Sequence, residues 1–85
     1  SISEVDNFRQ HWVNFITTYD DSFLQTIGVK NKDDLRESIL ALDLNVLSSA
    51  SHSLSKSDNS SMIKISSVLV ASLVPSIASS VNDTI

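Results

Sequence analysis

The chain has 85 residues, a formal net charge of −4 and no cysteine. A chain of this length forms at most one domain with a thin core, which we expect to span residues 1–85. The absence of cysteine excludes disulfides and thiolate metal sites. The six Lys and Arg residues are scattered and form no basic stripe, so a nucleic-acid partner is not expected. Because the chain begins at Ser1 without a signal segment, we expect it to be a processed or excised part of a longer protein.

Turn residues are scarce and serine is abundant. The single Gly and single Pro disfavour an all-β fold of many short hairpins. Serine occupies 18 positions, 14 of them from Ser48 onward, a bias typical of linkers or secreted structural proteins. These serines alternate with Val, Ile, Leu and Ala, so we expect an ordered segment. The predicted fold class is all-α, a small bundle of four to five helices.

The first predicted helix runs from Glu4 to Tyr19. Its apolar residues recur at helical spacings and form one stripe, made of Val5, Phe8, Trp12, Phe15, Ile16 and Tyr19. Ser3 is the expected N-cap, with Asp6 three residues later in the capping-box position. The spacing favours a core role for the stripe. Trp12 is also a candidate anchor for a partner, because tryptophan is enriched at binding hot spots.

A short second helix is expected to start at Asp20 or Asp21 and to continue through Phe23 towards Ile27. Gly28 then stands where a helix ending in a left-handed residue needs a glycine. The pattern therefore predicts a tight turn immediately after this helix.

A third helix is predicted to begin after Asn31, a favourable N-cap. Asp33 and Asp34 lie in its first turn, where the helix dipole favours carboxylates. Its apolar face is predicted at Leu35, Ile39, Leu42, Val46 and Ala50, and it fades over the serine-rich residues 48–53. The polar run at 55–60 is the clearest predicted loop.

The last segment, Ser60 to Val81, carries one charge, Lys64, and apolar residues around most of a helical circumference. Such a helix is expected to be buried on all sides. Its β-branched residues would also suit strands, but its length and lack of turn signals favour a helix. Pro75 is expected to kink this helix, because a proline in a regular helix interior costs about 3 kcal/mol of stability. The kink leaves open whether the segment forms one helix or two.

Residues 62–78 allow three interpretations. A membrane span is disfavoured, since the stretch falls short of the ~20 residues that a span needs and contains Lys64, Pro75 and four serines. A central core helix is the plain alternative. The third is a core helix whose outer side docks on a second copy, with small residues that permit close approach: Ser66, Ser67, Ala71, Ser72 and Ser79.

Two acidic pairs, Asp20-Asp21 and Asp33-Asp34, are typical of solvated helix starts. Alternatively, they would meet Lys64 or Lys56 of a partner chain and steer association. The candidate interface residues are therefore Trp12, Asp33, Asp34, Lys64, Val68, Ala71 and Ser72.

No residue pattern points to catalysis, a metal or a cofactor. The two histidines, His11 and His52, have no second ligand at metal-binding spacing. One glycine cannot form a glycine-rich phosphate loop, and no serine lies in a nucleophile elbow. We therefore expect a protein that is not an enzyme, with no catalytic, metal or cofactor site.

Residues 59–80, NSSMIKISSVLVASLVPSIASS, resemble a serine–alanine–aliphatic helix of the non-repetitive helical domains of spider silk proteins (spidroins), which carry a Lys soon after a Ser pair. The first half is similar too, with an early Trp-containing helix followed by a Phe-led one. The resemblance implies a helical bundle that dimerises and controls solubility and fibre assembly in response to pH, salt or shear. It also implies that Lys64 is the basic partner of an intersubunit Asp–Lys attraction.

The chain departs from that family in ways that remove the pH switch from the expectation. The acidic residues expected in the last helix are absent, and Pro75 and Ser76 stand in that region. The loop before this helix is longer, and the cysteine often seen in the carboxy-terminal type is missing.

Self-association is the leading functional hypothesis. We expect a non-enzymatic structural domain of a secreted, extracellular fibrous or matrix protein, with itself as partner in a homodimer or larger oligomer. The alternative is a monomeric module that holds a partner helix or peptide beside the Trp12 stripe, which requires Trp12 to be partly exposed.

Overall fold

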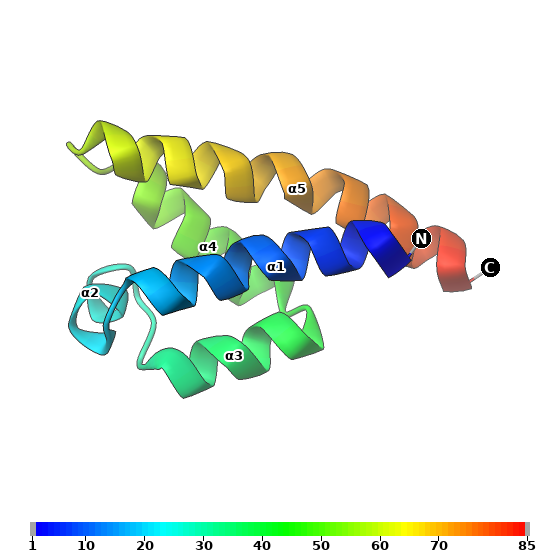
Figure 1. Cartoon of the computed structure of the whole chain (residues 1–85), viewed down its shortest axis with the longest axis horizontal. Helices are drawn as coiled ribbons and strands as arrows, with labels where there is room; N and C mark the ends of the chain where they lie inside the picture. Colours follow the sequence, from blue (N-terminus) through cyan, green and yellow to red (C-terminus); the bar gives the residue numbers. More distant parts are fainter. Residues whose placement is uncertain (1, 85) are drawn as a thin grey trace.

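The computed structural model describes residues 2–84, with side chains from 3 to 78, and consists of helices joined by short turns. In chain order these are α1 (Ile2–Thr18), α2 (Asp21–Thr26), α3 (Lys32–Ala41), α4 (Leu44–Ser55) and α5 (Ser60–Thr84). The predicted all-α bundle is confirmed. α5 lies along α1 and α4, α3 packs on the other side of α1, and α2 covers one end (Figure 1).

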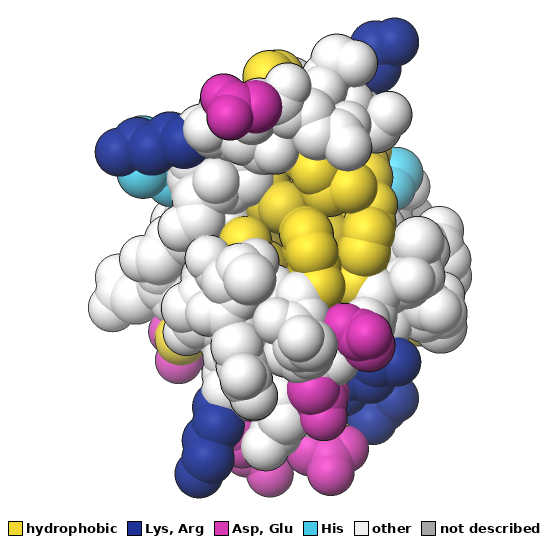
Figure 2. Space-filling model, turned by 90° about the vertical axis from the view of Figure 1, so that its left-hand side faces the viewer, with side chains coloured by type: hydrophobic (Ala, Val, Ile, Leu, Met, Phe, Trp, Pro, Cys, Tyr) yellow, Lys and Arg dark blue, Asp and Glu magenta, His cyan; other side chains and the backbone are white. Residues whose placement is uncertain are grey.

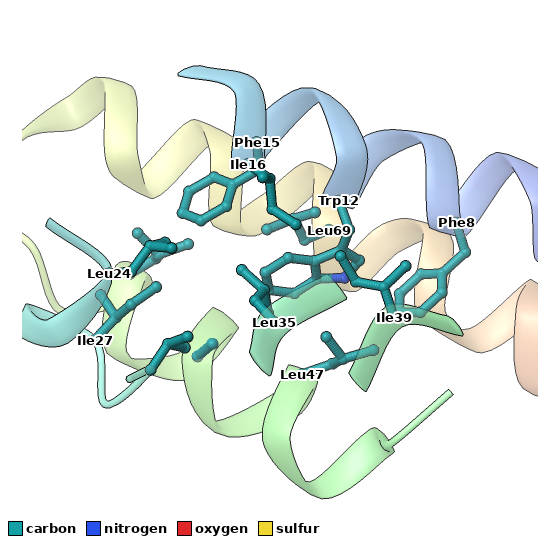
Figure 3. Close-up of a cluster of buried hydrophobic side chains, with 13 residues drawn as sticks. Phe8, Trp12, Phe15, Ile16, Leu24, Ile27, Leu35, Ile39, Leu47 and Leu69 are labelled. Atoms are coloured by element: carbon teal, nitrogen blue, oxygen red, sulfur yellow. The ribbon is translucent and has the colours of Figure 1, made fainter. Parts of the chain in front are cut away.

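The core is built around the aromatic stripe of α1, which the sequence spacing predicts correctly. Phe8, Trp12, Phe15 and Ile16 are buried, and Trp12 meets Phe15 edge to face with ring centroids 5.5 Å apart (Figure 3). Each of the other four helices adds at least one fully buried leucine, and these are Leu24, Leu35, Leu47, Leu54 and Leu69. Large apolar side chains from all five helices therefore enclose Trp12.

The predicted N-cap at Ser3 is wrong, because α1 already begins at Ile2 and Ser3 lies inside the helix. A capping side chain contributes only about 1 kcal/mol. A preference of that size does not prevent the helix from extending one or two residues beyond it. The end of α1 at Thr18 agrees with the predicted end at Tyr19 within one residue.

The predicted turn after α2 is confirmed. Gly28 has a φ of +83°, in the left-handed region that glycine adopts without steric cost. Its N–H donates to the carbonyl of Gln25 at 3.2 Å, and the N–H of Val29 donates to that of Leu24 at 3.0 Å. These two hydrogen bonds form a Schellman motif, which turns the chain from α2 towards α3.

The predicted third helix is in fact two. Its N-cap is correct, since the Asn31 side chain accepts a hydrogen bond from the N–H of Asp34 at 2.8 Å. The predicted continuation to Ala50 is wrong, because Leu42 adopts a left-handed conformation with φ 52° and ψ 49°. Asp43 then caps α4 by accepting from the N–H of Val46 at 3.4 Å.

Arg9 of α1 stabilises this break from across the bundle. Its Nε donates to the carbonyl of Ile39 at 3.2 Å, and its Nη2 donates to that of Leu40 at 2.8 Å. Both carbonyls belong to the last turn of α3, where the helix dipole favours a cation. The end of α3 is therefore fixed by a residue thirty positions earlier in the chain.

Candidate association surface on the last helix

α5 is a single helix that continues through Pro75, which settles the choice between one helix and two. Its predicted burial on all sides is wrong. Among its described side chains, those of residues 60–78, the fully buried positions are Ser66, Leu69, Ser72 and Ser76, whose spacing of three and four residues marks one face. Met62, Ile65 and Leu73 are half-buried on the same side and pack against the core. The inner side of α5 therefore combines large apolar residues with small serines.

The inward serines find hydrogen-bond partners in the backbone. Ser66 Oγ donates to the carbonyl of Ser51 in α4 at 2.8 Å, and Ser72 Oγ donates to the carbonyl of Leu69 at 3.0 Å. Small side chains also let helix axes approach closely, which brings α5 against the large aromatic residues of α1. Serine at these positions is thus compatible with burial because its hydroxyl is satisfied.

The opposite side of α5 exposes large aliphatic side chains. We define the outer α5 face by four residues that are 38–67% exposed: Ile63, Val70, Val74 and Ile77. Val68 is exposed as well, but it lies on the side of α5 next to α1. Small exposed residues lie among the four, at Ser67, Ala71 and Ala78. The helix is therefore apolar on the side that faces away from its own core.

The four residues of the outer α5 face follow a heptad-like spacing. Ile63, Val70, Val74 and Ile77 are separated by seven, four and three residues, the spacing of a seam that pairs with another helix. Lys64 is the one charged residue between Ser60 and Ala78. The seam itself is uncharged.

Three of the predicted interface residues lie on the exposed surface of α5. Lys64, Val68 and Ala71 are exposed there. Ser72 is not available, because it is only 8% exposed and faces the bundle. The prediction for Ser72 is wrong because its helical position places it on the same face as Leu69 and Ser76.

Trp12 is 0% exposed, so the prediction of a partly exposed Trp12 is wrong. Its aromatic stripe belongs to the core cluster, which Leu69 of α5 also joins. Asp33 and Asp34 are exposed at the start of α3, and α1 separates α3 from α5 in Figure 1. Within one copy, the acidic pair and Lys64 therefore belong to different surfaces.

The main residues that sequence reasoning missed are Ile63, Val70, Val74 and Ile77. They were expected to be core because the whole segment is apolar. Two signals in the sequence separate the faces: the heptad-like spacing of these residues, and the serines at the complementary positions 66, 72 and 76.

The chain matches no known protein family, no curated protein and no solved structure in the comparisons made. The function must therefore be argued from the residues and their arrangement.

Two further properties bear on the choice of function. Ser60–Ala78 is long and apolar enough to cross a membrane by length and composition, with a mean hydropathy of 1.6, and 22% of this stretch is buried in the bundle. A core helix of a soluble protein passes the same test of length and composition. Among the described side chains, those of residues 3–78, no three His, Cys, Asp or Glu residues lie close enough to hold a metal ion.

Proposed function

We propose that this chain is a non-enzymatic structural domain that self-associates through the outer α5 face. The observation that carries the proposal is the row of valines and isoleucines that α5 leaves exposed at a heptad-like spacing, beyond the residues that it packs on the core. Contiguous exposed apolar surface on a soluble protein usually marks an interaction site. A second copy is a suitable occupant because a two-fold axis pairs the same patch on both subunits.

The exposed area predicts a weak dimer. Complete burial of a Val or Ile side chain contributes about 1.5–3 kcal/mol. About half of each of the four side chains is still exposed, so each copy gains on the order of 4 kcal/mol, and a symmetric pair about 8 kcal/mol. Association itself costs about 4–15 kcal/mol. We therefore expect a dimer that forms in a concentration-dependent way rather than an obligate one.

The parent protein that we propose is a secreted fibrous protein whose assembly this domain controls. The serine bias from Ser48 onward supports this. The resemblance of residues 59–80 to the helical domains of spider silk proteins supports it as well.

The solution mass, measured by light scattering coupled to size exclusion over a range of concentrations, tests the proposal. The wild type should rise from the 9.3 kDa monomer towards twice that mass. Val74→Asp places a charge in the seam at its most exposed position, 67%, and should keep the chain monomeric. Leu40→Asp is the matched control, since Leu40 is 70% exposed on α3, and should behave as the wild type.

Two results would count against the proposal. One is a wild-type monomer at every concentration reached. The other is a Val74→Asp variant that dimerises as well as the Leu40→Asp control. A wild type that stays soluble only with detergent or vesicles would instead support the membrane interpretation of Ser60–Ala78.

A further inference from the structure

A second apolar surface lies apart from the heptad seam, in a groove between α1 and α5. The groove has a volume of about 280 Å³. Its apolar lining comes from Phe15, Ile65, Val68 and Leu69. It opens near the end of the molecule that α2 covers, where Figure 2 shows hydrophobic side chains gathered beneath the start of α5.

The rim of the groove is polar and carries one fixed positive charge. Lys64 lines it from α5, and His11, Asn14 and Thr18 line it from α1. No Asp or Glu is among the lining residues. Lys64 makes no ion pair or hydrogen bond with the part of the chain that the structure describes. An unpaired ammonium above an apolar floor suits a ligand with an anionic head and an apolar tail.

The volume limits the size of that tail. An apolar cavity of about 150 Å³ accommodates benzene, which has six carbons. By the same measure, a groove of about 280 Å³ suits a tail of roughly ten to twelve carbons. This length matches a medium-chain carboxylate, whereas the tail of a long-chain lipid would extend beyond the groove into solvent.

We propose that the groove between α1 and α5 binds medium-chain carboxylates, with the tail on Phe15, Ile65 and Leu69 and the carboxylate at Lys64. The proposal is independent of self-association, because the ligand occupies the α1 side of α5 and the seam occupies the opposite edge. At the ligand efficiency that is typical of small ligands, the roughly twelve non-hydrogen atoms of decanoate should give a Kd of roughly 0.04–2 mM.

Titration of isotope-labelled protein with decanoate, followed by amide chemical shifts, tests this at a concentration where light scattering shows the monomer. We expect saturable shifts around Asn14, Thr18 and residues 65–69. Decyltrimethylammonium, which has the same tail and the opposite charge, and acetate, which has the head alone, should each bind far more weakly. Equal affinity for decyltrimethylammonium, or no saturable response to decanoate, would overturn the proposal.

Lys64→Met keeps the aliphatic stem and removes the charge. It should weaken decanoate binding about tenfold, the effect of losing one charge-assisted hydrogen bond. Lys30→Met is the matched control, because Lys30 is exposed and does not line the groove, and it should change the Kd less than twofold. Equal weakening in both variants would mean that the carboxylate responds to net charge and not to Lys64, and would also overturn the proposal.

Discussion

Replacing Arg9 by methionine would remove the link that joins α1 to the end of α3. The guanidinium donates to the carbonyls of Ile39 and Leu40 at 3.2 and 2.8 Å. The chain leaves the helix at Leu42, so neither carbonyl has its regular helical partner four residues later, although that of Ile39 still accepts from the N–H of Leu42 at 3.2 Å. Methionine keeps the length and the apolar stem of the side chain, so the substitution removes the hydrogen bonds and the charge alone.

The expected loss of stability is about 2 kcal/mol. A hydrogen bond from a charged group contributes about 1.5–3 kcal/mol when it is shielded from water. The Nε bond is partly buried, but the Nη2 bond is exposed and adds less because water replaces it. For a domain of this size, 1 kcal/mol shifts Tm by about 4–8 °C, so Arg9→Met should lower Tm by roughly 8–16 °C.

Thermal and denaturant unfolding followed by circular dichroism would measure this change. Arg36→Met is the matched control, since Arg36 makes an exposed ion pair with Asp33 at 3.0 Å, a kind of pair that contributes about 0.5 kcal/mol or less. Arg9→Lys should recover about half of the loss, because one ammonium reaches one carbonyl at a time.

Equal destabilisation by Arg9→Met and Arg36→Met, within experimental error, would refute the reasoning. It would show that the end of α3 is stable without Arg9. The hydrogen bonds across the bundle would then be a consequence of the fold and not a reason for it.

Three further substitutions, one of them with a matched control, test local features by denaturant unfolding. Gly28→Ala should cost about 1–2 kcal/mol. This cost comes from backbone strain at a positive φ and not from a steric clash, because no atom lies within 4 Å of an added Cβ. A neutral result would contradict the left-handed turn. Asn31→Ala should cost about 1 kcal/mol by removing the α3 cap, and no change would mean that water caps the helix as well. Ser66→Ala should cost about 1 kcal/mol and Ser67→Ala almost nothing, so equal effects would argue against the bond to Ser51.

Much of the fold follows from local signals in the sequence. The aromatic spacing of α1, the glycine after α2 and the asparagine before α3 each act within a few residues, so the sequence predicts them correctly. The break at Leu42 is different. A leucine in the left-handed region carries no local signature, and it is held by Arg9, which is distant in the sequence.

The candidate surface was predicted only in part, for a physical reason. Hydrophobicity indicates which residues prefer to leave water, but it does not say whether they do so within one chain or between two. α5 has more large aliphatic residues than its own core takes up: Ile65, Leu69 and Leu73 pack inward, whereas Ile63, Val70, Val74 and Ile77 remain outside. Lys64, Val68 and Ala71 were predicted as surface contacts, whereas Val70 and Val74 were expected to be core.

The single tryptophan provides an internal spectroscopic probe. Trp12 is enclosed by the core, and its Nε1 has no hydrogen-bond partner within the described part of the chain, so its emission should resemble that of indole in an apolar solvent. Partners that bind to the outer α5 face do not touch this ring. A red shift on adding a partner or ligand would therefore report an opening of the bundle, and an unchanged spectrum beside a doubled mass would report association of intact domains.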